Sequence, residues 1–139
     1  MPLRAARKFA RFVLAREGIA PECELSVVFC DEETISALNQ QFLNQAGPTD
    51  VISFPLDEAP RASMPDEGWA VLGDVVICTD VALAQAKRRG ITLEDETLDL
   101  LAHGILHLLG CDDASPHARR KMLRRQKELL EEFKRAADA

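Results

Sequence analysis

The sequence lacks any apolar run close to the roughly 20 residues that a membrane-spanning helix needs. It also lacks paired cysteines, because Cys23, Cys30, Cys78 and Cys111 are scattered and form no C-x-x-C pair. We therefore expect a protein without a membrane partner. The four cysteines are predicted to be free thiols, largely buried, rather than metal ligands.

Acidic residues are absent before Glu17, and the start of the chain has no apolar core of the secretory type. An Arg-rich start is compatible with a transit peptide. However, Arg4, Lys8 and Arg11 fall opposite a set of apolar residues at helical spacing. That set is Leu3, Ala6, Ala10, Val13 and Leu14. We predict the first helix of the fold here and a cytoplasmic location.

Basic residues are fewer than acidic ones. The chain has 17 Lys and Arg and 23 Asp and Glu, for a net charge of −6. This balance argues against an indiscriminate nucleic-acid binder, because the phosphate backbone favours a positive footprint, although it is compatible with a local basic patch. Hydrophobic residues make up 47% of the chain, as in ordinary globular proteins. The 139 residues predict one domain over 1–139.

Strand and helix patterns are mixed along the chain, which predicts the α+β class. Strands are expected at 24–30, 50–55 and 69–78, the last with a bulge or turn at Gly73. Helices are expected at 31–43, 79–90, 92–109 and from 116 onward. Their predicted N-caps are Asp31, Thr79 or Asp80, Thr92 and Ser115. Residues 56–68 are expected to form an exposed, mobile loop.

Two histidines stand out in the helix at 92–109, which from Leu98 on is apolar almost all round and should lie at the centre of the protein. His103 and His107 are four residues apart, so both rings project from one face about one turn apart. Gly110 can take the left-handed conformation that ends a helix, which lets Asp113 reach the same point. Two imidazoles and one carboxylate with an open fourth position are typical of catalytic zinc.

We therefore predict one zinc ion per chain, held by His103, His107 and Asp113. A purely structural histidine pair is the alternative, and an iron site with the same ligands is chemically allowed. Asp112 is expected to hydrogen-bond a ligand or to cap the chain reversal. His117 is either a reserve ligand or a surface histidine.

The spacing H-x-x-x-H-x-x-G-x-x-D is similar to the zincin motif H-E-x-x-H-x-x-G-x-x-H. Gly104 stands where a zincin protease has its glutamate general base. This departure weakens a metalloprotease reading, because no carboxylate is positioned to activate water. No catalytic side chain is predicted, and the chemistry is assigned to a water molecule on the metal.

The segment "HGILHLLGCDD" (103–113) resembles the signature H-G-x-L-H-L-x-G-x-D-H of the YbeY family, bacterial metal-dependent endoribonucleases of ribosomal RNA maturation. "LNQQFLNQAGPTDVISFP" (38–55) is similar to the family's L-N-x-x-Y-R-x-x-x-x-P-T-D-V-L-S-F-P, and "LGDVVICTDVALAQA" (72–86) to its L-G-D-I-x-I-S. The match runs from about Leu38 to Met122. It implies a small mixed β-sheet packed with about five helices, with a zincin-like metal helix at the centre.

Two positions depart from the family pattern. Asp113 stands for its third histidine, and Leu43 stands for the arginine that follows its aromatic residue. An arginine near the metal would stabilise charge on a scissile phosphate, which leucine cannot do. Arg61, Arg88 and Arg89 are candidate substitutes, with solvated surface charge as the alternative.

The last helix combines an apolar spacing (Met122, Gln126, Leu129 and Phe133) with a basic run that either tracks RNA or is a solvated face. The basic run is Arg119, Arg120, Lys121, Arg124, Arg125 and Lys127.

The resemblance implies a zinc-dependent, single-strand-specific endoribonuclease. Its expected partners are ribosomal RNA and the small ribosomal subunit, with ribosome-associated proteins as further candidates. The alternative is a ribosome-assembly binding protein with a structural zinc and little or no activity, and a metalloprotease ranks third.

Overall fold

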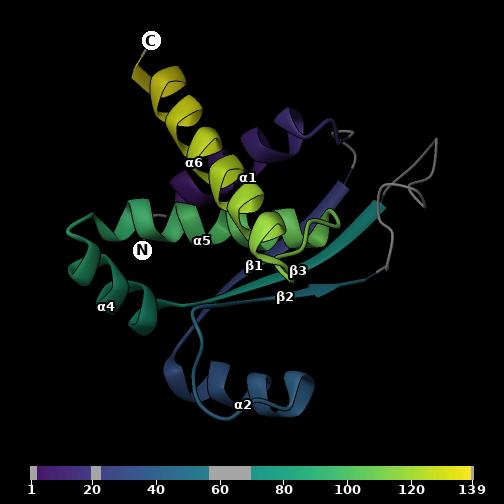
Figure 1. Cartoon of the computed structure of the whole chain (residues 1–139). Coiled ribbons are helices and arrows are strands. Elements are labelled where there is room, and N and C mark those ends of the chain that lie inside the picture. Colours follow the sequence, from purple (N-terminus) through teal and green to yellow (C-terminus); the bar gives the residue numbers. More distant parts are fainter. Residues whose placement is uncertain (1–2, 20–22, 57–69, 139) are drawn as a thin grey trace.

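The computed structural model describes residues 3–19, 23–56 and 70–138 (Figure 1). Within them, five helices and three strands confirm the predicted α+β class and helix number. In chain order they are α1 (Leu3–Arg16), β1 (Cys23–Cys30), α2 (Glu32–Leu43), β2 (Val51–Pro55), β3 (Ala70–Cys78), α4 (Thr79–Arg89), α5 (Leu93–Leu108) and α6 (Pro116–Asp138). Most of the loop expected at 56–68 lies outside the described residues, and the single domain over 1–139 stays a prediction.

The three strands form a mixed sheet in the order β1-β3-β2. The central strand β3 runs parallel to β1 and antiparallel to β2. The register shifts near one end, where Glu24 pairs with Val71 but Leu25 pairs with Gly73. The extra residue in β3 is therefore Leu72, which confirms the irregularity predicted at Gly73. A Cβ at Gly73 would collide with the Phe54 carbonyl oxygen, so only glycine fits this bulge.

Alternate residues of β3 pack into two apolar clusters on opposite faces of the sheet. Val75 and Ile77 join the larger cluster with α1, α5 and α6, whereas Val76 and Cys78 join a smaller one with α2. Figure 1 shows α2 on one side of the sheet and α5 with α6 on the other. Helix α5 contacts α1, α4, α6, β2 and β3, which confirms its predicted central place.

Three of the predicted N-caps are confirmed. Asp31, Thr92 and Ser115 accept hydrogen bonds from backbone N–H groups three residues later, at 2.8, 3.0 and 3.0 Å. The cap predicted for α4 at Thr79 or Asp80 is wrong, because the helix begins directly after Cys78, which makes no side-chain cap. Both side chains instead form hydrogen bonds to the connection between β1 and α2. Thr79 donates to the Cys30 carbonyl at 3.3 Å, and Asp80 accepts from the Glu32 N–H at 3.2 Å.

Helix α1 is amphipathic as predicted. However, Leu3 of the predicted apolar set is 61% exposed, and Phe9, which was not in that set, is buried. The prediction of largely buried thiols is wrong. Only Cys78 is buried, whereas Cys23 and Cys30 lie half-buried at the ends of β1, at the edge of the sheet, and Cys111 is exposed after α5. None of these four cysteines forms a disulfide. Among the described residues, no helix combines the length and the apolar character needed to cross a membrane.

Candidate metal centre

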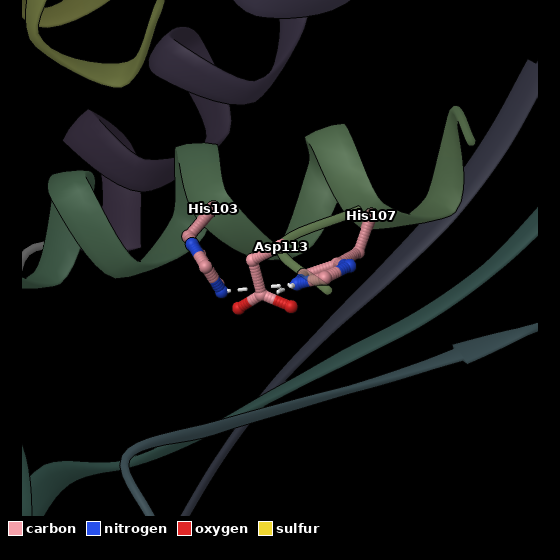
Figure 2. A group of neighbouring side chains, drawn as sticks. All are labelled: His103, His107 and Asp113. Carbon is pink, nitrogen blue, oxygen red and sulfur yellow. Dashed lines mark hydrogen bonds and ion pairs between the residues drawn. The ribbon is translucent and has the colours of Figure 1, made fainter. Parts of the chain in front are cut away.

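His103 and His107 project from the same face of α5, as their four-residue spacing predicts (Figure 2). Their Nε2 atoms are 3.1 Å apart, and both rings are half-buried. Burial and the neighbouring His103 ring hold the pKa of His107 below its ordinary value, against the opposing effect of Asp113. A neutral imidazole is the form that binds a metal ion.

Asp113 reaches the histidines through a chain reversal at the end of α5. Gly110 has a φ of +98°, and the Cys111 N–H donates to the Leu106 carbonyl at 3.0 Å, which closes the helix end. Asp112 accepts from the Ala114 N–H at 3.1 Å, so it caps the reversal, one of its two predicted roles. An Asp113 carboxylate oxygen then lies 3.9 Å from His107 Nε2.

The three side chains form a donor set that fits a divalent metal ion. Their ligand atoms all lie within 4.8 Å of one another. A tetrahedral zinc ion with bonds of about 2.0–2.1 Å separates its ligand atoms by roughly 3.3 Å. The observed separations of 3.1 and 3.9 Å lie on either side of that value. His117, the reserve ligand, is exposed at the start of α6 and is not part of this group.

Gly104 faces the sheet and allows α5 to approach it closely. A Cβ at this position would lie 2.6 Å from Val75 Cγ1 and 3.2 Å from Ser53 Oγ. The Ser53 hydroxyl also donates to the Gly104 carbonyl at 2.8 Å. A glutamate side chain has no space here. The close packing of α5 on the sheet therefore excludes the zincin general base at this position.

The family model for endoribonuclease YbeY matches residues 3–134. The chain belongs to the YbeY family. A relative named endoribonuclease YbeY from Thermobifida fusca is 46% identical over 132 residues, which cover 94% of this chain and 85% of the relative. One of the same name from Beutenbergia cavernae is 46% identical over 125 residues, covering 89% and 83%. The solution structure of TM1509 from Thermotoga maritima matches with a TM-score of 0.66 and 30% identity, over 94% of this chain and 79% of that one.

Relative to the YbeY pattern, the position of the missing arginine lies at the end of α2. Leu43 is 49% exposed there, and the preceding Phe42 packs edge-on against Phe54 at 5.3 Å between ring centroids. Among the candidate substitutes, Arg61 lies outside the described residues. Arg88 and Arg89 both line a cavity of about 390 Å³ that also contains His103.

The two arginines differ in their partners. Arg89 donates to Glu96 at 2.5 Å and to Asp99 at 3.3 Å, so its charge is already compensated. Arg88 is exposed and forms no ion pair with any residue that the structure describes. Among the described residues that line this cavity, Arg88 is therefore the cation without an ion pair.

Gln126 is a site residue that the sequence did not single out. It comes from α6, is 3% exposed, and its Oε1 lies 2.8 Å from His103 Nδ1. The available signal was a polar residue at an apolar helical spacing, between Met122 and Leu129.

Proposed function

We propose that this protein is a metal-dependent endoribonuclease. Family membership supports this activity, because the relatives from Thermobifida fusca and Beutenbergia cavernae carry that name. The observation that carries the proposal is the convergence of His103, His107 and Asp113 at the edge of a cavity that both His103 and Arg88 line. A divalent cation bound there would polarise the phosphodiester and make water a stronger nucleophile.

The chain's own residues have separate tasks in this proposal. His103, His107 and Asp113 hold the ion, which we propose to be zinc at one ion per chain. Arg88 contacts an RNA phosphate beside the ion and stabilises the charge that develops there. Gly104 allows α5, which carries both histidines, to pack closely against the sheet.

Single-stranded ribosomal RNA is the proposed substrate, with the small ribosomal subunit as the setting. The exposed residues of the last helix, Arg119, Arg120, Lys121, Arg124 and Lys127, supply a local positive surface in a chain of net charge −6. Arg125 is not part of it, because it pairs with Glu17 at 2.8 Å and Glu128 at 3.1 Å. Phosphate contacts along this surface would weaken as salt rises, because counterions compete.

Zinc-loaded protein incubated separately with ribosomal RNA and with casein tests this function. We expect cleavage of RNA that stops on chelation and returns with zinc, and no cleavage of casein. His107→Ala is the matched control and should cleave neither. RNA binding without cleavage would favour the assembly protein with a structural zinc, and cleavage of casein would favour a metalloprotease.

A further inference from the structure

Gln126 is a buried amide placed directly behind His103. Its Oε1 lies 2.8 Å from His103 Nδ1, whereas the other ring nitrogen, Nε2, faces His107. Gln126 is one of four buried polar residues among those described, and Met122 and Leu129 on the same helix face are apolar. A buried amide in such a position needs partners for both of its ends.

Asp99 fixes which way this amide points. Gln126 Nε2 donates to Asp99 Oδ1 at 3.2 Å, and Asp99 Oδ2 accepts from Arg89 at 3.3 Å. An ionised carboxylate only accepts hydrogen bonds. The NH₂ end of Gln126 must therefore face Asp99, and its carbonyl oxygen must face His103.

Arg89 is itself held in place. It donates to Glu96, which is 3% exposed, at 2.5 Å. Burial raises the pKa of the Glu96 carboxyl, and the hydrogen bond from Arg89 opposes that rise. The chain of contacts thus extends from α4 through α5 and α6 to the histidine.

We propose that Gln126 and Asp99 are positioning residues that set the tautomer of His103. Because the Gln126 carbonyl only accepts, the ring proton of His103 resides on Nδ1, and the lone pair on Nε2 points toward His107 and Asp113. This inference rests on the proposed function, since the lone pair matters there as a metal ligand. Partners of this kind orient metal-binding histidines in many proteins.

Gln85 provides a matched control within the same cavity. It lines the cavity beside His103, but its amide donates to Asp50 at 3.3 Å. Replacing it removes a glutamine from the cavity and leaves the His103–Gln126 bond in place. A purely structural role for Gln126 predicts a change in stability with no change in the position of the ring proton.

The test combines two measurements on Gln126→Met, Gln85→Met and the unaltered protein. Nitrogen-15 NMR of the imidazole rings, on metal-free protein, reports whether Nδ1 or Nε2 carries the proton of His103. Competition with a chromogenic chelator gives the zinc affinity. We expect Nδ1–H in the unaltered protein and in Gln85→Met. Gln126→Met should lose that preference and bind zinc about 10- to 100-fold more weakly.

A double variant makes the test sharper. Asp99→Asn combined with Gln126→Glu reverses the polarity of their contact, since the asparagine amide donates to the new carboxylate. That carboxylate still accepts from Nδ1–H, so the tautomer and most of the zinc affinity should return. This variant keeps the proposal testable if Gln126→Met does not fold.

An unchanged tautomer and unchanged zinc affinity in Gln126→Met, or Nε2–H in the unaltered protein, would overturn the proposal. So would a double variant that folds but does not regain Nδ1–H. If the unaltered protein shows Nδ1–H but binds no zinc, the proposed function fails while the positioning by Gln126 stands.

Discussion

Gly104 illustrates how one missing side chain shapes the candidate site. Replacing it with alanine favours helix formation by about 1 kcal/mol, because glycine is a poor helix former. The new Cβ would meet Val75 Cγ1 at 2.6 Å, however, and a β-branched side chain in a sheet yields little. Overpacking of this kind costs about 1–3 kcal/mol. Set against the helix-forming gain, the middle of that range predicts that Gly104→Ala lowers the free energy of unfolding by about 1 kcal/mol, measured by urea denaturation.

Val75→Ala supplies the matched control for this prediction. Removing the two methyl groups makes room for the new Cβ, so the double variant should lose less stability than the two single variants added together. Strict additivity, or a Gly104→Ala variant as stable as the original, would show that α5 does not approach the sheet as closely as described.

Asp113 stands where the family pattern has its third histidine. Asp113→His should still bind zinc, because both groups suit the ion, whereas Asp113→Ala should lose most of the bound zinc. Isothermal titration with zinc measures both. His117→Ala is the control, since this exposed histidine lies outside the group of ligands. Normal binding by Asp113→Ala together with weak binding by His117→Ala would make His117 the third ligand.

At the scale of the element, the last turn of α4 brings positive charge to the cavity beside the site. Arg88 lines that cavity, whereas the neighbouring Lys87 is exposed and does not. Both residues lie in the last turn of α4, so both interact similarly with its helix dipole. Losing a charged stabiliser of a transition state typically lowers the rate about a hundred- to a thousand-fold. We predict that loss in RNA cleavage for Arg88→Ala and little change for Lys87→Ala.

Zinc content and circular dichroism should be the same in both variants. Equal rates for Arg88→Ala and Lys87→Ala would place the phosphate contact elsewhere, and Arg61 would be tested next.

The end of α2 offers the converse experiment. Leu43→Arg places an arginine where the family pattern has one, so RNA cleavage should rise by up to about a hundred- to a thousand-fold at unchanged zinc content. Gln41→Arg adds the same charge at an exposed position of the same helix and should change the rate little. No gain from Leu43→Arg, together with the predicted loss in Arg88→Ala, would show that Arg88 alone supplies this charge and that an arginine at the end of α2 adds nothing to it.

At the scale of the whole molecule, local geometry explains why the ligands could be predicted from the sequence. His103 and His107 share a face because a helix repeats every 3.6 residues. The role of Asp113 could be predicted because a glycine that ends a helix lets the chain turn back, and Gly110 has the left-handed φ of +98°. Neither inference needs to know what packs against α5. The α+β class is equally accessible, because periodicity distinguishes strands from helices.

Contacts between distant segments were not accessible in this way. Gln126 meets His103 only because α6 packs across α5, over a separation of 23 residues. Gly104 has no space for a side chain because Val75 of β3 packs against it. The N-cap expected at Thr79 was wrong because that side chain bonds to the end of β1 instead. In each case a tertiary contact decides the outcome, and no local pattern encodes it.

The number of zinc ions bound per chain tests the central claim most directly. Protein stripped with a chelator, reloaded with zinc and freed of excess metal should contain one zinc per chain by elemental analysis. His107→Ala should lose most of it, because the two remaining ligands cannot close a zinc site. Stoichiometric zinc retained by His107→Ala would contradict the assignment of His103, His107 and Asp113 as the metal centre.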